Sequence, residues 1–255
     1  MSRLLALALL PALASCATRP DPHANTPPFA RQPYQAFSRA AVVAVALREW
    51  RLFGMRVDDD PPGPRLARDD KPERAEGLWQ RVGEYWWLGM DAGRAEALWT
   101  GRHDARGQPF PPESDEAYAW SAAFVSYVMR IAGAGGRFPY AAAHHVYIDA
   151  AREVSLGRAH WAVSAEPSAA YTPLPGDLVC FSRTPAPLRF DDLPAGRFPA
   201  HCDIVVAKDA ARLDVVGGNV DDAVTLKHVA VAPNGTMLDD RYPWFVALRV
   251  LYENP

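Results

Sequence analysis

The sequence is poor in cysteine and lacks the common zinc-binding motifs. It has 255 residues with only three cysteines. It contains neither a Cys-X-X-Cys pair nor a His-Glu-X-X-His segment, so we expect no metal centre and no cofactor. The formal net charge is −3, which gives no general attraction to nucleic acid. No internal repeat is present, and no apolar stretch after the N-terminal region is long enough to cross a bilayer.

The first 16 residues have the pattern of a secretory signal. Arg3 supplies a positive charge, residues 4–13 form a short apolar run, and Leu-Ala-Ser precedes Cys16. The small residues before Cys16 resemble a bacterial lipobox, in which the cysteine is lipidated and becomes the mature N-terminus. An ordinary signal peptide with a chance cysteine is the alternative. Both readings predict export from the cytoplasm.

The residue after Cys16 bears on the destination of the chain. Ala17 stands there rather than an aspartate, which resembles the pattern of lipoproteins sent to the outer membrane. We therefore expect a lipid-anchored protein of the bacterial envelope that faces the periplasm. Residues 17–35 are rich in proline and polar groups and predict a tether, and residues 36–255 predict one domain.

Helical periodicity comes first in the domain and strand periodicity follows it. Apolar spacing predicts helices over 38–54, 73–88, 120–129 and 145–154, of which 120–129 is expected to be buried. The period then changes to two and predicts strands over 177–181, 202–207, 213–216, 223–229 and 245–251. Helices followed by an antiparallel meander predict an α+β fold.

The two cysteines that remain after Cys16 are Cys180 and Cys202. An even pair in an exported protein predicts a disulfide, and two buried free thiols are the alternative. Cys202 follows His201 directly, so in a strand the two side chains point to opposite faces. Cys202 is therefore a poor candidate for a nucleophile that works with His201.

Four short segments carry the possible chemistry. They are Trp-Ser-Ala-Ala-Phe at 120–124, Pro-Gly-Asp at 175–177, His-Cys-Asp at 201–203 and Gly-Gly-Asn at 217–219. Their order resembles the papain-like CHAP (cysteine, histidine-dependent) amidases and peptidases of bacterial walls. Together with Phe-Pro-Tyr at 138–140 and His144, they are more closely similar to the bacterial domain of unknown function 2272 family, over about residues 36–252.

The resemblance implies a papain-like, CHAP-type fold and a set of site residues. By position, Ser121 takes the place of the nucleophile, His201 that of the base and Asn219 that of the group orienting the histidine. In the CHAP amidases and peptidases the nucleophile is a cysteine, whereas this chain has a serine at that position. A hydroxyl is far less acidic than a thiol, so Ser121 could attack only if His201 removed its proton during the reaction. The two side chains must then lie within proton-sharing reach.

Each of these residues also has a structural interpretation. Ser121 could bond a backbone group at a helix end, His201 could be a half-exposed surface histidine, and Asn219 could be a turn residue with positive φ. Asp203 shares a face with His201 and would either orient it or be a solvated carboxylate.

Three further side chains are candidates for a cleft. Trp120 is a core or cleft-wall residue, and His144 lies at a helix start. Asp177 is expected to fix the Pro-Gly-Asp turn by bonding backbone amides rather than to react.

Two functions follow from these motifs on an exported chain. The first is an envelope hydrolase that cleaves peptide or amide bonds of peptidoglycan through Ser121, His201 and Asn219. The second is a catalytically silent module that uses the same cleft to bind peptidoglycan or an envelope protein. A third interpretation is an envelope scaffold with an incidental cleft. In each case the lipid anchor would be the contact with the membrane.

Overall fold

The structure is a computed structural model that describes residues 36–61, 71–90 and 94–252. They belong to one compact unit, Gln35–Pro255. The predicted signal with Cys16 and the predicted tether lie outside the described residues. Within the described part of the chain, no helix combines the length and apolar character that a bilayer crossing requires.

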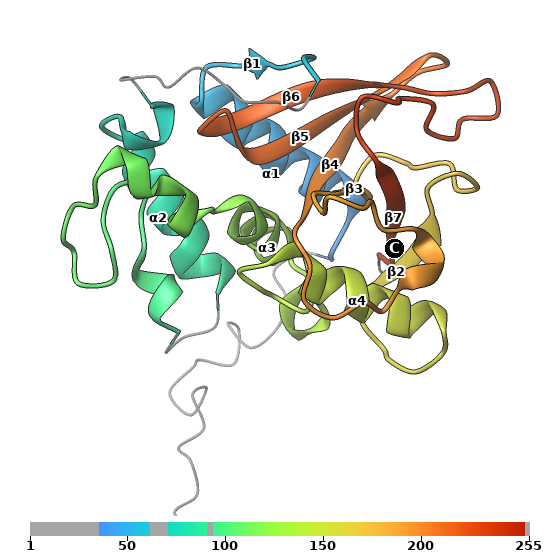
Figure 1. The fold of residues 1–255 in the computed structure, drawn as a ribbon, viewed down its shortest axis with the longest axis horizontal. Helices are drawn as coiled ribbons and strands as arrows, with labels where there is room; N and C mark the ends of the chain where they lie inside the picture. Colours follow the sequence, from blue (N-terminus) through green and yellow to red (C-terminus); the bar gives the residue numbers. More distant parts are fainter. Residues whose placement is uncertain (1–35, 62–70, 91–93, 253–255) are drawn as a thin grey trace, which may run out of the picture. The chain divides into compact units, whose positions relative to one another are not determined.

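The described residues form a mixed α+β fold around one seven-stranded, mostly antiparallel sheet (Figure 1). The strand order is β1-β6-β5-β4-β3-β7-β2. Strands β3 to β6 form the predicted meander, whereas β7 returns to the far side of β3. The bounds are β1 Arg56–Val57, β2 Val163–Pro167, β3 Leu178–Ser182, β4 Ala200–Lys208, β5 Arg212–Val220, β6 Ala223–Ala230 and β7 Trp244–Val250.

Some elements differ from the sequence expectation for local reasons. The helix predicted over 73–88 is divided into a 3-10 turn, Pro72–Arg74, and helix α2, Leu78–Gly89. Gly77 separates them with a φ of 86°, which an α-helix does not allow. Strand β4 begins two residues earlier than predicted and thereby includes His201. The short strands β1 and β2 were not predicted.

Three helices pack against the sheet and the fourth packs against one of them. Helices α1 (Arg39–Leu52) and α3 (Ser121–Ile131) contact β4 and β5, α4 (His144–Ser155) contacts β2 and β4, and α2 packs on α3. The Ser38 hydroxyl caps α1 by accepting from Ala41 N at 3.2 Å. The helix that begins at Ser121 is therefore held between the sheet and α2.

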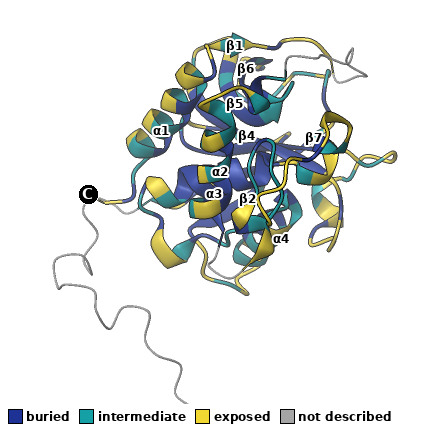
Figure 2. Cartoon of the chain, turned by 90° about the vertical axis from the view of Figure 1, so that its left-hand side faces the viewer, coloured by how far each residue is buried: buried dark blue, intermediate teal, exposed yellow. Residues whose placement is uncertain are grey.

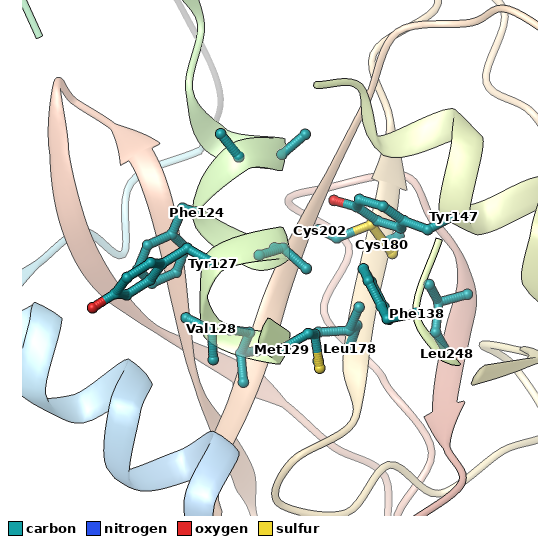
Figure 3. Close-up of a cluster of buried hydrophobic side chains, with 14 of the residues drawn as sticks. Phe124, Tyr127, Val128, Met129, Phe138, Tyr147, Leu178, Cys180, Cys202 and Leu248 are labelled. Atoms are coloured by element: carbon teal, nitrogen blue, oxygen red, sulfur yellow. A yellow bond between two sulfur atoms is a disulfide. The ribbon is translucent and has the colours of Figure 1, made fainter. Parts of the chain in front are cut away.

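Helix α3 is the centre of the hydrophobic core. Its residues Ser121 to Met129 are all buried, and α3 is mostly dark blue in Figure 2. Figure 3 shows side chains of α3, among them Phe124 and Met129, gathered with Leu178 of β3 and the disulfide between Cys180 and Cys202. The disulfide joins paired positions of β3 and β4. The start of α3 is thus fixed by packing along the length of the helix.

A buried carboxylate of α1, Glu49, joins α1 to α2 and also accepts from the Tyr127 hydroxyl of α3 at 3.3 Å. Glu49 of α1 is 0% exposed and receives two 2.7 Å hydrogen bonds from Arg81 of α2. Tyr85 donates to it at 2.8 Å, and Arg48 donates at 2.8 Å. Burial alone would raise the pKa of Glu49, but Arg81, Arg48 and Tyr85 outweigh burial and lower this pKa. The ionised carboxylate is therefore the form that the fold stabilises.

Replacing Glu49→Gln should lower the free energy of unfolding by about 3 kcal/mol, because the buried partners of Glu49 lose their counter-charge. Glu84→Gln is the matched control. Glu84 also pairs with Arg81 but is half exposed, so its loss should cost less than about 1 kcal/mol. Urea denaturation measures both. Equal effects of the two substitutions would contradict the structural role of Glu49.

Candidate active site

Ser121 is the first residue of α3. The residue in the N-cap position, Trp120, makes no side-chain capping bond. The first N–H groups of a helix have no partner within the helix and carry its partial positive charge. The Ser121 hydroxyl therefore lies where negative charge is stabilised. Its side chain is buried, with 6% of the residue exposed.

The hydroxyl of Ser121 forms a hydrogen bond with a histidine of α4. Ser121 Oγ lies 2.7 Å from His144 Nε2, and the other ring nitrogen, Nδ1, is hydrogen-bonded to the hydroxyl of Tyr147. His144 is the first residue of α4 and Tyr147 follows one turn later on the same face. All three side chains are buried. The result is a chain of three side chains, Ser121, His144 and Tyr147.

His201 belongs to a second hydrogen-bonded chain. Its Nε2 lies 2.9 Å from Asp203 Oδ1, and Lys227 Nζ lies 2.7 Å from Asp203 Oδ2. Arg183 Nη2 lies 3.3 Å from His201 Nδ1. His201 and Asp203 are 0% exposed. The alternatives of a half-exposed His201 and a solvated Asp203 are thus wrong, since both side chains are buried against each other.

Gly217 explains how Lys227 of β6 reaches Asp203 of β4 across the intervening strand β5. A Cβ on Gly217 would lie 1.9 Å from Asp203 Oδ1 and 2.9 Å from His201 Nε2. Any side chain at position 217 would therefore collide with the pair. A bulge between Gly217 and Val220 interrupts the β5–β6 pairing at this point.

The rest of the Gly-Gly-Asn segment is equally constrained. A Cβ on Gly218 would lie 2.6 Å from the Phe124 ring of α3, so glycine lets the strand approach the helix. Asn219 has a φ of 56°, a left-handed conformation that asparagine tolerates. The conformation fits the interpretation of Asn219 as a turn residue. The carboxylate that contacts His201 is Asp203.

The two hydrogen-bonded series of side chains come close to each other at His144 and His201. The rings of His144 and His201 have centroids 5.1 Å apart. The imidazole bonded to Ser121 nevertheless comes from α4, whereas the resemblance had suggested the imidazole of His201. Both ring nitrogens of His201 already face other groups, namely Asp203 and Arg183.

Burial and nearby cations keep both imidazoles neutral. Burial lowers the pKa of His201 to about 4, although Asp203 opposes this, and Arg183 and Lys227 lower it further. The pKa of His144 is well below its usual value because of burial, His201 and Arg183. Burial would raise the pKa of Asp203, but Lys227 and His201 outweigh it and lower this pKa. At neutral pH the site holds two uncharged imidazoles beside an ionised Asp203.

Tyr147 is held as a neutral phenol. Burial, assisted by the charge of Asp203, raises its pKa well above the usual value. The hydroxyl of Tyr147 can therefore donate to or accept from His144, and the choice fixes which nitrogen of His144 carries the proton.

Trp120 and Asp177 have structural partners. Trp120 is 1% exposed, and its indole N–H donates to the carboxylate of Glu73. Burial and the nearby carboxylates of Asp222 and Asp115 raise the pKa of Glu73 to about 8, although Trp120 opposes the shift. Trp120 is thus a residue of the hydrophobic core that directly precedes Ser121 in the chain.

Asp177 fixes the turn before β3. Its carboxylate accepts from the backbone N–H groups of Leu174 and Val250, each at 3.0 Å. It also accepts from Arg39 at 2.9 Å and from the Tyr171 hydroxyl at 2.8 Å. The expectation that Asp177 bonds backbone amides is confirmed.

Two cavities lie near the site, although Ser121, His144 and His201 are not among the residues that line them. One, of about 570 Å³, includes Trp86, Trp99 and Tyr140 in its lining, together with Ala119 and Ala143, which stand next to the Ser121 and His144 segments. The other, of about 560 Å³, includes Arg183, Asn219 and Lys227. Among the described residues, no group of three or more His, Cys, Asp or Glu side chains is arranged to hold a metal ion.

Comparison with protein families identifies the family to which this domain belongs. The family described as "Uncharacterized protein conserved in bacteria (DUF2272)" matches residues 73–250. The chain belongs to the DUF2272 family. The match includes Ser121, His144, His201 and the 217–219 segment and begins after α1. Comparisons of this DUF2272 chain with curated proteins and with solved structures found no match.

Three residues of the DUF2272 site were missed by sequence reasoning. Tyr147 could have been found as the residue one helical turn after His144. Lys227 interrupts an apolar alternation in β6, and a lysine at an inward position is a signal of a buried partner. Arg183 follows β3 directly and carried no signal of its own.

Titration of His201 should destabilise the DUF2272 domain as the pH falls from about 6.5 to 4, whereas Glu73, with its pKa raised to about 8, contributes with the opposite sign. The native pKa of His201 is about 4, so over this interval the unfolded chain binds protons that the native state does not. For His201 alone the loss is about 3 kcal/mol at pH 4 relative to pH 7. His144 contributes with the same sign.

Urea denaturation at several pH values, with and without His201→Gln, measures this effect. The variant should show a shallower pH dependence over the same interval, because glutamine does not titrate. NMR should show the His201 ring uncharged at pH 5.5. A His201 ring that titrates above pH 6 would contradict the electrostatic description.

Proposed function

We propose that the DUF2272 chain is a hydrolase of the bacterial envelope, with a papain-like domain that cleaves peptide or amide bonds of peptidoglycan through Ser121. The observation that carries the proposal is the 2.7 Å hydrogen bond between Ser121 Oγ and His144 Nε2 at the start of α3. A nucleophile at a helix N-terminus that packs on an antiparallel sheet is the arrangement that the CHAP resemblance implies. Here the base is His144 rather than His201.

The reaction is an acyl transfer. His144 Nε2 accepts the proton of Ser121 as Oγ attacks the carbonyl carbon, and His144 Nδ1–H donates to the Tyr147 hydroxyl. Backbone N–H groups at the start of α3 stabilise the negative oxygen that develops. The imidazolium then gives its proton to the leaving nitrogen as the C–N bond breaks. Water attacks the acyl-serine in the same way and regenerates Ser121.

In this proposal His201 and Asp203 are positioning residues. The His201 ring packs near His144, and the Asp203 charge favours the imidazolium that forms on His144 during the reaction. Asn219 lies in the bulge between Gly217 and Val220 and tolerates the positive φ found there. The cavity with Trp86, Trp99 and Tyr140 lies beside the Ser121 and His144 segments and would hold the wall fragment.

The catalytically silent module remains a second candidate because of Tyr147. A buried phenol that donates to His144 Nδ1 leaves the proton on Nε2, which then donates to Ser121 and cannot act as a base. Arg183 and His201 further disfavour a charged His144. In that state the domain would hold a wall peptide or an envelope protein without cleaving it.

Digestion of purified peptidoglycan sacculi by the full-length chain in mild detergent decides between these functions. Active protein should release new amino and carboxyl termini, and Ser121→Ala and His144→Gln should each lower the rate at least about 100-fold. His160→Gln, at an exposed histidine that lines neither cavity, is the matched control and should keep the rate. Tyr147→Phe should lower kcat more than it changes KM, because it removes only the orientation of His144.

The silent module predicts a different set of outcomes. No release would be seen on any sacculus preparation, and Ser121→Ala would bind sacculi as the unchanged protein does. Ser121→Cys then tests for a dormant site. A thiol at the helix N-terminus has a lowered pKa and should react with iodoacetamide faster than free cysteine does.

We also infer that the chain is exported and anchored by a lipidated Cys16 in the outer membrane, facing the periplasm. The lipobox-like segment before Cys16 and the identity of Ala17 support this inference. The disulfide between Cys180 and Cys202 in the core gives separate support, because such bonds persist in oxidising compartments. A peptidoglycan substrate would be within reach of such an anchor.

Cys16→Ser should abolish labelling with radioactive palmitate and move the chain from the membrane fraction to the soluble fraction. Two or more acyl chains give stable anchoring, so their loss should leave little membrane-bound protein. Ala17→Asp is the matched control. It should keep the label and shift the chain toward the inner-membrane fraction. Unlabelled wild-type protein would contradict the anchor.

A further inference from the structure

We propose that Glu73 is a positioning residue of the candidate site: in its uncharged form it holds the indole of Trp120 and thereby fixes Ser121 at the start of α3. The proposal deepens the proposed function, because it gives the hydrolase a control by pH. It rests on that function only for the effect on turnover, since the contact between Glu73 and Trp120 can be followed in a protein that hydrolyses nothing.

The side chain of Trp120 connects Glu73 with the start of α3. The indole N–H donates to the Glu73 carboxyl at 2.5 Å, and the ring packs against Tyr85 of α2 with the centroids 5.5 Å apart. The carbonyl of Trp120 accepts the first hydrogen bond of the helix, from Phe124 N at 2.9 Å. A displaced indole would therefore disturb the residue on which the first turn of α3 is built, directly before Ser121.

Glu73 is buried without a counter-charge. It is 3% exposed. Its sequence neighbours Lys71 and Arg74 both pair with Asp115, each at 2.8 Å, and Lys71 also lies 3.7 Å from Asp222. Among the residues that the structure describes, no cation pairs with Glu73 itself. A buried carboxyl without a cation favours its uncharged form, because the charged form would lose its hydration.

Ionisation of Glu73 would add an unbalanced charge to these contacts. Asp115 comes from the 3-10 helix Pro112–Tyr118 and Asp222 from the turn between β5 and β6, and the two cations already balance these two carboxylates. Burial raises the pKa of Glu73, and the indole of Trp120 lowers it. The charges of Asp222 and Asp115 add to the effect of burial, and the resulting pKa is about 8. Glu73 is therefore uncharged at neutral pH and becomes charged as the pH rises through about 8.

The backbone of Glu73 is held in place, so a charge acts on its side chain. Glu73 N donates to Asp222 O at 2.9 Å, and a Cβ on Gly101 would lie 2.0 Å from Glu73 O. Repulsion between an ionised Glu73 and the nearby carboxylates is therefore relieved by movement of its side chain. That movement takes the acceptor away from the indole of Trp120 and loosens the residue before Ser121. The hydrolase would thus lose activity at alkaline pH through the position of its nucleophile.

NMR of the indole N–H groups in the full-length protein in detergent tests the contact. The Trp120 signal is identified by its loss in Trp120→Phe, and it should change with a midpoint near pH 8. Glu73→Gln should abolish this change, because a glutamine accepts from the indole but does not titrate. A Trp120 signal that is constant from about pH 6 to pH 10, or that still titrates in Glu73→Gln, would overturn the proposal.

The chain offers a matched control in Trp79 and Glu76. Trp79 also donates its indole N–H to a carboxylate, that of Glu76, at 3.1 Å. Glu76 is exposed, and the hydrogen bond from Trp79 lowers its pKa. The Trp79 signal should therefore stay constant over the same interval, and Glu76→Gln should leave the titration of the Trp120 signal in place. Loss of that titration in Glu76→Gln would contradict Glu73 as the titrating group.

The rate of sacculus digestion as a function of pH tests the effect on turnover. One pH unit above its pKa only about one tenth of Glu73 is uncharged, so kcat at about pH 9 should be about tenfold below kcat at pH 7. Glu73→Gln should lack this fall, and Glu76→Gln should keep it. A purely structural Glu73 would instead give a variant whose rate is lowered by the same factor at every pH, and that result would overturn the positioning role.

The two measurements separate this proposal from the hydrolase itself. Titration of the Trp120 signal that depends on Glu73, in a protein that releases no wall termini, would support the contact and contradict the hydrolase. Hydrolysis with the same pH profile in the unchanged protein and in Glu73→Gln would support the hydrolase and contradict the positioning role.

Discussion

The site depends on one buried carboxylate. Asp203 is removed from water and remains ionised because Lys227 and His201 both contact it. Removing a charge from water costs several kcal/mol, and only close partners offset the cost. The ion pair reaches over β5 because Gly217 has no side chain there. The tautomer of His201 follows from this arrangement, because its Nε2 faces the ionised carboxylate.

The second constraint is the placement of Ser121. Helix α3 is buried along most of its length, so its first residue has a fixed position relative to β4 and α4. A hydroxyl in such a position gains reactivity only from its neighbours, and the neighbour given by the fold is His144. The packing of α4 therefore determines which histidine is the base. The motif at 201–203 gives no information about that packing.

Periodicity predicted the α+β class, helices α1, α3 and α4 and the strands of the meander. It failed where a local conformation decided the outcome, as at Gly77, or where a strand was short, as for β1. Within the site, Ser121 and His201 could be selected because the motifs around them resemble those of a known family, and Asp203 because it lies two residues from His201 on the same face of a strand. The bond between Ser121 and His144 joins residues 23 positions apart, and only tertiary packing determines it.

The Glu49 network extends beyond the family match. The DUF2272 family matches residues 73–250, whereas Glu49 lies in α1 and binds Arg81 and Tyr85 inside that range. Helix α1 also covers part of the sheet with Val42 and other buried side chains. The folding unit is thus longer than the segment matched by the family. A protein cut at residue 73 would lose the buried carboxylate that binds Arg81 and Tyr85 and would have an uncovered apolar face, which makes it a poor substitute for the intact domain.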